Sequence, residues 1–309
     1  MLGIVILNYY AWNQTLECIE SIQKAECEES YKVIVVDNAS PTPMPDALRD
    51  MISKNSISYL ETEENIGFAR GNNLGIEYAQ QMGCDYILLA NSDIRFHKKS
   101  IDEMIQYLRN HSDVGIVGPK ILTPEGDIQK TNLMRKTTMS DKWRIRTIAR
   151  KLFRKTTSQY YGYDLDYNQT RKVYAVNGCC FMLSPKFLEK IGKLDEHTVL
   201  YEEELILGVL MEQQGLVTIY DAEAVVTHHH KQSSKHVVPF SFLCLSCSEI
   251  YYCSRYLHAS KVNVYLLYYY RSIIYLLHGI RHREFMGDEW TRYKAETGKY
   301  LRKYVKNIS

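Results

Sequence analysis

Two residues with carboxylate side chains directly follow apolar runs in the sequence. Asp37 ends "VIVVD", and Asp93 ends "YILLANSD". An apolar run without alternation predicts a strand buried on both faces, and such strands deliver the residues behind them to the sheet edge where α/β proteins bind ligands. A carboxylate there can accept hydrogen bonds from a base or ribose, or hold a divalent ion through oxygen. Asp37 and Asp93 are therefore candidate binding residues.

A segment rich in glycine and asparagine, "NIGFARGNNLG" (65–75), lies between them. Its small residues would let a diphosphate approach the backbone, and Arg70 could offset the charge. The chain has neither the glycine spacing of a dinucleotide fingerprint nor a P-loop. Ordinary turns are the alternative, but three such motifs at successive strand ends favour ligand binding.

An acidic run, "LYEEEL", holds Glu202, Glu203 and Glu204. On a helix such a run is most often a solvated face. This one stands between two apolar stretches, an arrangement that could point one carboxylate into a cleft.

Three histidines follow in "VVTHHHKQSS", at the end of a predicted strand. Successive strand residues face opposite ways, so His228 and His230 share one side and His229 does not. A neutral imidazole could complete a metal site that Asp93 begins. Three surface histidines without a role are the alternative.

Strand and helix signals alternate through the first half of the chain, which predicts a doubly wound α/β sheet with helices on both faces. Ser100 and Glu103 have the spacing of a capping box. Ser184, Pro185 and Gly192 mark the N-cap, first turn and end of a short helix. The predicted strands are 3–7, 33–37, 57–60, 86–90 and 114–122, and the predicted helices include 16–22, 46–53 and 100–110.

The amino-acid composition changes after Lys130. The stretch to Lys155 is strongly basic, and its apolar residues between 145 and 152 recur at helical spacing, which predicts a basic amphipathic helix. From about Pro239 the chain is helical and rich in Tyr and Leu.

Composition limits the class of partner. The 309 residues carry 38 basic and 36 acidic side chains, so the net charge is too small to favour binding of nucleic acid. No secretory leader is visible, and the cysteines follow no disulfide framework, so we expect a cytoplasmic protein.

In this order, the motifs resemble the family-2 glycosyltransferases with the GT-A fold, especially the branch of rhamnosyl- and galactofuranosyltransferases. The resemblance covers roughly residues 2–236, through "VILNYY", "VIVVDNAS", "ENIGFARGNNLGI", "YILLANSD", "VGIVGPKIL", "VNGCCFMLSPKFLEKIGKLDE" and "AVVTHHHKQSS". It implies a Rossmann-like, mostly parallel sheet in a catalytic domain over 1–236, with a basic insert at 130–170. A helical, Tyr-rich region would cover 237–309.

The resemblance also implies roles for individual residues. Asn8 and Asp37 would hold the nucleotide base. Asp93 would hold Mn²⁺ or Mg²⁺, together with His228 or, as the alternative, His230. The other residues expected to contact the nucleotide sugar are Asn38, Asn65, Gly67, Arg70, Asn73, Asn91 and Ser92.

One departure affects the catalytic base. In the family, a Glu-Asp pair is followed by a second Asp two residues later. The corresponding pair in this chain is Glu203 and Glu204, and it is followed by Leu205 and Ile206. Glu204 matches the base position with a side chain one methylene longer, so the base is either Glu204 or Glu203. The second acid is missing, and acceptor recognition is expected to differ.

The expected activity is inverting, metal-dependent transfer of a sugar from a nucleotide-sugar donor, dTDP-rhamnose or a UDP-hexose. The acceptor would be a glycan or a lipid-linked sugar of a bacterial surface polysaccharide. The alternative is a non-catalytic binding or scaffold subunit with the same fold, which the weakened acidic motif favours. A nucleotidyltransferase would need a glycine-rich loop near the first strand, and "LNYYAWNQ" has no glycine.

The stretch 262–280 is long enough for a membrane span, which needs roughly 20 apolar residues. Arg271 near its middle and tyrosines along its length argue against a span. We expect a helix at the membrane surface, with the basic segment 142–155 attracted to anionic lipid on the inner face of the plasma membrane. Packing on the catalytic domain or a homodimer contact is the alternative.

Overall fold

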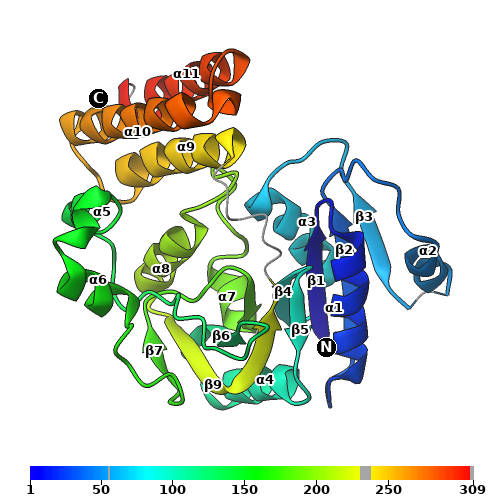
Figure 1. Ribbon diagram of the computed structural model, residues 1–309. Helices are drawn as coiled ribbons and strands as arrows, with labels where there is room; N and C mark the ends of the chain where they lie inside the picture. The colour runs from blue at the N-terminus through cyan, green and yellow to red at the C-terminus, as the bar shows by residue number, and fades with distance from the viewer. Residues whose placement is uncertain (55, 230–237, 307–309) are drawn as a thin grey trace. The chain divides into compact units, whose positions relative to one another are not determined.

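The chain is described by a computed structural model over residues 1–54, 56–229 and 238–306 (Figure 1). Its contacts define two compact units. Unit 1 consists of Met1–Lys136, Ser158–Leu194 and Leu207–His230. Unit 2 consists of Thr137–Thr157, Asp195–Ile206 and Lys231–Ser309. Unit 2 therefore takes in two segments from inside the predicted catalytic domain.

Unit 1 is built on a mixed sheet. Within the described ranges, its nine strands are β1 (Leu2–Asn8), β2 (Tyr31–Asp37), β3 (Ser58–Glu61), β4 (Tyr86–Asn91), β5 (Ile94–Phe96), β6 (Val114–Leu122), β7 (Arg171–Val173), β8 (Cys180–Leu183) and β9 (Val217–His228). Their order is β3-β2-β1-β4-β8-β6-β9-β5, and β7 also pairs with β9. Strands β3, β2, β1 and β4 run parallel, as do β6 and β9. The carboxyl ends of β1, β2 and β4 therefore lie at one edge.

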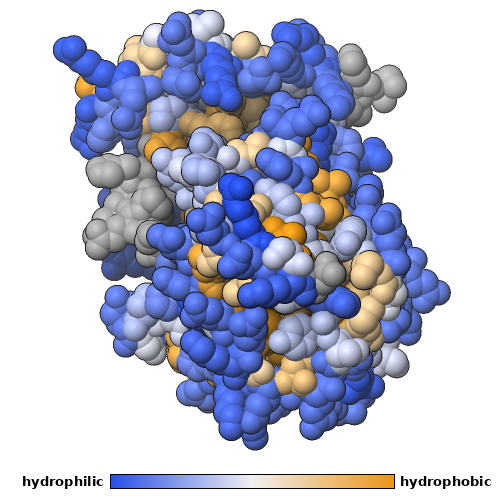
Figure 2. Space-filling model, turned by 90° about the vertical axis from the view of Figure 1, so that its right-hand side faces the viewer, coloured by the Kyte–Doolittle hydropathy of each residue, from blue (hydrophilic) through white to orange (hydrophobic). Residues whose placement is uncertain are grey.

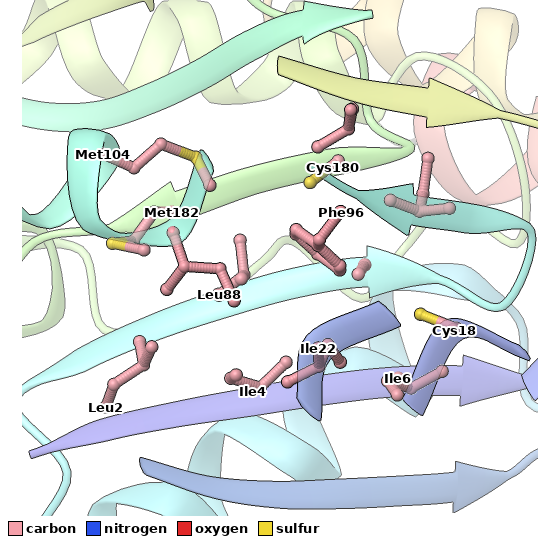
Figure 3. Close-up of a cluster of buried hydrophobic side chains, with 14 of the residues drawn as sticks. Leu2, Ile4, Ile6, Cys18, Ile22, Leu88, Phe96, Met104, Cys180 and Met182 are labelled. Atoms are coloured by element: carbon pink, nitrogen blue, oxygen red, sulfur yellow. The ribbon is translucent and has the colours of Figure 1, made fainter. Parts of the chain in front are cut away.

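Helices cover both faces of this sheet. One face carries α1 (Trp12–Lys24), α2 (Asp46–Ser53) and α4 (Ser100–Asn110). The other carries α3 (Phe68–Gln81), α7 (Pro185–Lys190) and the later turns of α8 (Glu203–Gln213). In β1, Ile4 and Ile6 enter the first core and Val5 the second (Figure 3). A strand covered on both faces needs apolar residues at every position, so the unbroken runs identified the strands.

The α/β, GT-A-like fold class predicted from the sequence is confirmed. Ser184 caps α7 by accepting a hydrogen bond from the Phe187 amide at 3.1 Å, and Gly192 ends the segment with a φ of +83°. The capping box at Ser100 is wrong. That residue already lies inside α4, and its hydroxyl donates to the His97 carbonyl at 2.8 Å. On the face shown in Figure 2, hydrophilic residues predominate, with smaller apolar groups between them.

Unit 2 is helical, as predicted for the Tyr-rich end of the chain. Its main helices are α5 (Met139–Arg144), α9 (Pro239–Arg255), α10 (Lys261–Arg281) and α11 (Asp288–Leu301). The last three enclose a core around Phe242, Tyr275, Phe285 and Tyr293. Across the ranges given above, none of the helices has both the length and the apolar character that crossing a membrane requires.

The single basic amphipathic helix expected across 145–152 is wrong. Helix α5 ends at Arg144, a 3-10 turn covers Ile148–Lys151, and α6 (Arg154–Tyr161) begins afterwards. The Thr147 hydroxyl accepts a hydrogen bond from the Ala149 amide at 3.1 Å, so this side chain caps a new turn. Ile148 and Leu152, at 71% and 85% exposure, then point to solvent.

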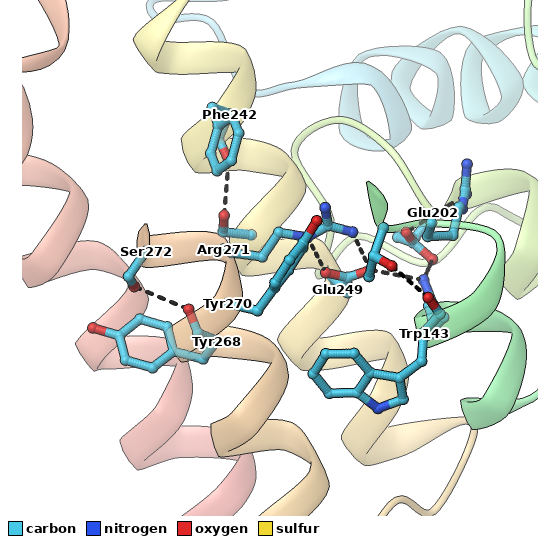
Figure 4. Close-up of polar contacts among 12 residues, drawn as sticks. Trp143, Glu202, Phe242, Glu249, Tyr268, Tyr270, Arg271 and Ser272 are labelled. Atoms are coloured by element: carbon cyan, nitrogen blue, oxygen red, sulfur yellow. Dashed lines mark hydrogen bonds and ion pairs between the residues drawn. The ribbon is translucent and has the colours of Figure 1, made fainter. Parts of the chain in front are cut away.

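Four buried charges join three helices of unit 2 to the segment Asp195–Ile206 (Figure 4). Lys142 of α5 lies 2.6 Å from Glu202 and 3.4 Å from Glu249 of α9. Arg271 of α10 makes two hydrogen bonds to Glu249, at 2.7 and 3.0 Å. Burial raises the pKa of Glu249, but Lys142 and Arg271 outweigh it and lower that pKa to about 2. Glu249 therefore stays ionised at neutral pH.

Candidate functional site

Strand pairing brings Asp93 and His228 together. The chain leaves β4 at Asn91, turns through Ser92 and Asp93, and enters β5 at Ile94. Strand β5 pairs antiparallel with β9, so that Ile94 is opposite His228. His228 Nε2 thereby lies 3.2 Å from Asp93 Oδ1. His230, the alternative ligand, lies outside the described residues.

The donor atoms of this pair suit a divalent cation. His228 Nδ1 is 3.1 Å from Gln129 Oε1, and because that amide oxygen only accepts, Nδ1 carries the hydrogen of this bond and Nε2 is the ring nitrogen beside Asp93. Asp93 Oδ1 is buried and accepts no hydrogen bond from any residue that the structure describes. A carboxylate oxygen and an imidazole nitrogen at this distance need a proton or a cation between them. The carboxylate suits Mn²⁺ or Mg²⁺ and the imidazole suits a transition-metal ion, so Mn²⁺ fits the pair better than Mg²⁺.

The protein supplies few ligands at this point. Over the described ranges, no group of three or more His, Cys, Asp or Glu residues is arranged to hold a metal. A magnesium-type site commonly combines one or two carboxylates with water and substrate phosphates, and Asp93 with His228 is consistent with such a site.

The turn that carries Asp93 is braced from both sides. The Asn91 amide donates to the Cys179 carbonyl at 2.8 Å, and the Ser92 carbonyl accepts from Arg95 at 3.1 Å. Arg95 also pairs with Glu17 of α1. Asn91 and Ser92 thus shape the turn, while a contact of their side chains with a nucleotide sugar remains a prediction. Arg95 was not among the residues predicted from the sequence for this role.

Asp37 lines a pocket of about 640 Å³ at the end of β2. Trp12, Ser40, Tyr59 and Arg49 are among the other lining residues. The Tyr59 hydroxyl lies 3.3 Å from Asp37 Oδ2, and burial, with the charge of Asp37, raises the pKa of Tyr59 well above its usual range. Tyr59 therefore stays protonated and donates to the carboxylate.

Asn8 lies behind this pocket and does not line it. Its amide nitrogen donates to Asp37 at 3.2 Å and to the Ser40 hydroxyl at 2.9 Å, and its oxygen accepts from Thr15 at 2.8 Å. Asn8 holds Asp37 in place, and its direct contact with a base remains a prediction. Ser40 and Tyr59 were not among the predicted site residues, although Ser40 belongs to the same "VVDNAS" motif.

Asn38 holds the loop before α3. Its amide nitrogen donates to Asn65 at 3.0 Å and to the Gly67 carbonyl at 3.2 Å, and its oxygen accepts from the Ile66 amide at 2.9 Å. Gly67 has φ +88° and ψ 179°, a conformation that is essentially limited to glycine. Arg70 follows on the exposed side of the first turn of α3. This fixed loop presents Asn65 and Gly67 together, and their contact with a nucleotide sugar remains a prediction.

The second half of the glycine-rich segment has a different role from the one expected. Residues 68–75 belong to α3, and a Cβ on Gly75 would lie 2.2 Å from Val5 Cγ1. Gly75 therefore permits close packing of α3 on β1 and does not serve the approach of a diphosphate. Asn73 is buried and exchanges two 2.9 Å hydrogen bonds with the Leu194 backbone, so its amide ties α3 to that segment. A role for Asn73 in donor binding remains a prediction.

The acidic run belongs to unit 2. Tyr201 and Glu202 have φ of +74° and +72°, a strained conformation for non-glycine residues, and the buried network holds Glu202 there. Burial, together with the charge of Glu204, raises the pKa of Glu203 to about 8. Glu204 is half-buried in the first turn of α8. The run is thus no solvated face.

A mixed sheet with aspartates at the ends of β2 and β4 and helices on both faces is the architecture of the GT-A glycosyltransferases. Residues 3–192 match the family model described as glycosyl transferase family 2, and the chain belongs to that family.

Two relatives show the range of similarity. The chain is 26% identical over 206 residues to the low-salt glycan biosynthesis hexosyltransferase Agl10 of Haloferax volcanii, a match that covers 66% of this chain and 59% of Agl10. It is 23% identical over 217 residues to an N-acetylglucosaminyl-diphospho-decaprenol L-rhamnosyltransferase of Mycobacterium tuberculosis, covering 67% of this chain and 69% of the relative.

A solved structure supports the fold. The crystal structure of GalNAc-T7 with UDP, GalNAc and Mn²⁺ superposes with a TM-score of 0.58 at 11% identity, over 82% of this chain and 50% of the other. At this identity the likeness concerns the fold alone.

Proposed function

We propose that this chain is an inverting glycosyltransferase that moves a sugar from a nucleotide-sugar donor to a glycan or lipid-linked acceptor of a surface polysaccharide. Family membership supports sugar transfer. The observation that carries the proposal is the 3.2 Å approach of Asp93 Oδ1 and His228 Nε2 at the end of β4 and β9. This pair would bind Mn²⁺ or Mg²⁺, and such an ion supplies positive charge that offsets a leaving nucleoside diphosphate.

Binding of the donor would fall to unit 1. Asp37, oriented by Asn8 and Tyr59, would accept hydrogen bonds from a base, and Trp12 and Tyr59 give the pocket aromatic walls. Its volume lies in the usual range for small ligands. Asn65, Gly67 and Arg70 would face the diphosphate and sugar. The name of the mycobacterial relative supports a rhamnosyl donor such as dTDP-rhamnose, and that of Agl10 supports a hexose donor such as a UDP-hexose.

Removal of a proton from the acceptor hydroxyl would fall to Glu204. A base must be ionised to accept a proton, and a pKa of about 8 keeps most of Glu203 protonated at neutral pH. Glu203 is the second candidate. A diphosphate-linked lipid is the acceptor class in the name of the mycobacterial relative, and we propose the same class here.

Unit 2 carries a surface suited to an anionic membrane. The outer face of α10 exposes an uncharged stripe of six residues: Val262, Leu266, Tyr269, Ile273, Leu276 and Ile280. The amide of Ile148 donates to the Tyr270 hydroxyl at 3.0 Å, which brings the exposed segment 148–155 beside α10. That segment exposes Arg150, Lys151, Arg154 and Lys155. Apolar surface flanked by cations favours attachment to anionic lipid on the cytoplasmic face.

The test combines binding with turnover. Thermal melting with UDP or dTDP, with and without Mn²⁺, should show stabilisation that requires both ion and nucleotide. A panel of nucleotide sugars with a prenyl diphosphate-linked sugar should then reveal transfer. Stabilisation without turnover for any donor would favour the scaffold subunit, and the absence of both would refute the proposal.

A further inference from the structure

A second pocket is lined only by residues of unit 2, all of which lie beyond the residues 3–192 that match the family model. Its volume is about 530 Å³, and Tyr251, Tyr256, Tyr304 and His197 form much of its wall. The His197 and Tyr251 rings stack with centroids 5.0 Å apart, and Tyr304 meets Tyr251 edge-on at 4.8 Å. These contacts fix the rings and give the pocket flat apolar surfaces with polar rims.

One partly buried carboxylate organises this wall. Asp195 accepts hydrogen bonds from the Tyr251 hydroxyl at 2.6 Å, from the Tyr256 hydroxyl, and from the His197 amide at 2.9 Å. Burial opposes ionisation of Asp195, but these bonds outweigh burial and lower its pKa. Asp195 is therefore an anion, and the hydrogen-bond donors of Tyr251, Tyr256 and His197 stabilise its negative charge.

The rim of the pocket is cationic. Arg255 and Lys303 line it with exposed side chains, and His258 lies beside them. The Ser254 hydroxyl, which also lines the pocket, is buried and has no hydrogen-bond partner among the residues described. An unsatisfied buried hydroxyl costs free energy unless a ligand or water completes it. Two full cations outnumber Asp195, so the pocket favours an anionic ligand that also offers hydroxyls.

We propose that this pocket binds the phosphorylated saccharide of the acceptor. A sugar ring presents an apolar C–H face to the tyrosines and hydroxyls to Ser254, while Arg255 and Lys303 would bind the phosphate. The inference rests on the proposed function. It is supported by the placement of the candidate bases, because Glu203, Glu204, Asp195 and His197 all belong to the segment Asp195–Ile206. A base must reach the acceptor hydroxyl, so acceptor recognition belongs in the unit that carries the base.

Binding can be measured without turnover. Isothermal titration of the full chain would use N-acetylglucosamine 1-phosphate, the neutral sugar and inorganic phosphate as probes. The double variant R255Q/K303Q should weaken binding of the sugar phosphate by about tenfold or more, because each cation contributes a charge-assisted bond. The double variant R283Q/K294Q, which removes two exposed cations elsewhere in unit 2, should bind like the wild type.

Kinetics separate this inference from the proposed function. In R255Q/K303Q, KM for a prenyl diphosphate-linked sugar should rise while KM for the donor and donor hydrolysis stay unchanged. A single Tyr304→Leu variant should weaken the sugar phosphate but not inorganic phosphate. Unchanged binding and KM in both variants would overturn the pocket assignment even if transfer is observed. Equal loss for sugar phosphate and inorganic phosphate in Tyr304→Leu would overturn the saccharide part.

Discussion

Asp93 holds a carboxylate oxygen in a buried position where no described group donates a hydrogen bond to it. If Asp93 binds the ion, Asp93→Ala should reduce transfer by about 100- to 1,000-fold, the usual cost of losing one electrostatic contact to a developing charge. It should also abolish Mn²⁺-dependent thermal stabilisation by UDP or dTDP. Asp127→Ala, which removes an exposed aspartate of unit 1, is the control. Near wild-type turnover in Asp93→Ala with an intact fold would rule out this role.

The neighbouring acids of α8 can be distinguished by amide substitution. Glu204→Gln should keep nucleotide-sugar binding and lose turnover, since an amide cannot accept the acceptor proton at neutral pH. Glu203→Gln should lower turnover less, because Glu203 is already largely protonated there. Steady-state kcat with saturating donor measures both. The reverse ranking would transfer the role to Glu203, and two active variants would remove the base assignment altogether.

Glu203 should also make stability depend on pH. Its pKa is about 8 in the folded chain against an ordinary 4.5, so between these values the folded state binds more protons than the unfolded state. The free energy of unfolding must then fall as pH rises from 4.5 to 8. Glu203→Gln should flatten this slope in denaturant unfolding at pH 5, 6.5 and 8, whereas exposed Glu189→Gln should keep it. Equal slopes in all three proteins would contradict the raised pKa.

Some of these residues could be recognised in the sequence because they follow strands. Asp37 and Asp93 end apolar runs, and strand ends of an α/β sheet converge. Tyr59 and Gln129 could not be recognised, because their positions depend on pairing between segments far apart in the chain. Lys142 and Glu202 look like surface charges, and only the folded chain shows them bonded and buried.

Helix α3 approaches strand β1 so closely that one glycine becomes necessary. In Gly75→Ala the new methyl would lie 2.2 Å from Val5 Cγ1, so we expect a loss of about 1–3 kcal/mol in unfolding free energy. Urea unfolding followed by circular dichroism measures it. The double variant Val5→Ala/Gly75→Ala should recover part of the loss.

Gly298 provides the matched control for this substitution. It lies inside α11, where a Cβ would meet only the flexible end of Arg302 at 3.5 Å. Gly298→Ala should be neutral or stabilise by up to about 1 kcal/mol. If Gly75→Ala behaved like Gly298→Ala, the close packing of α3 on β1 would be incorrect.

Elements buried on two faces were the most predictable ones. From Val33 in β2 and from Ile87 in β4 every residue is apolar until the last one of the strand, and α7 carries its own cap and stop in Ser184 and Gly192. The helix expected over 145–152 failed because helical spacing alone does not form a helix. Thr147 starts a separate turn there, and no partner surface buries Ile148 and Leu152.

For the whole molecule, we expect association with anionic vesicles that weakens with salt. Flotation with anionic and neutral liposomes at low and high salt measures it. Replacing Arg150, Lys151, Arg154 and Lys155 with Ala should remove about 1 kcal/mol of binding free energy for each charge near the surface. Leu266→Ser with Ile273→Ser should weaken binding in high salt as well, because it removes apolar contact.

The control removes four exposed lysines of unit 1, Lys24, Lys32, Lys54 and Lys99, and should leave flotation unchanged. Indifference of the wild type to both lipids would end the membrane proposal. Concentration-dependent dimers without lipid, lost in Leu266→Ser with Ile273→Ser, would instead assign the α10 face to a second copy of the chain.

The segmental make-up of unit 2 limits how this chain can recombine. Because unit 2 draws on three separate stretches, no single crossover can exchange it between relatives. A chain cut before α9 would keep Lys142 and Glu202 but lose Glu249 and Arg271, and the helices that shield them from water. If unit 2 binds the acceptor, changes in acceptor preference would therefore accumulate through point substitutions in unit 2 and not through exchange of the whole unit.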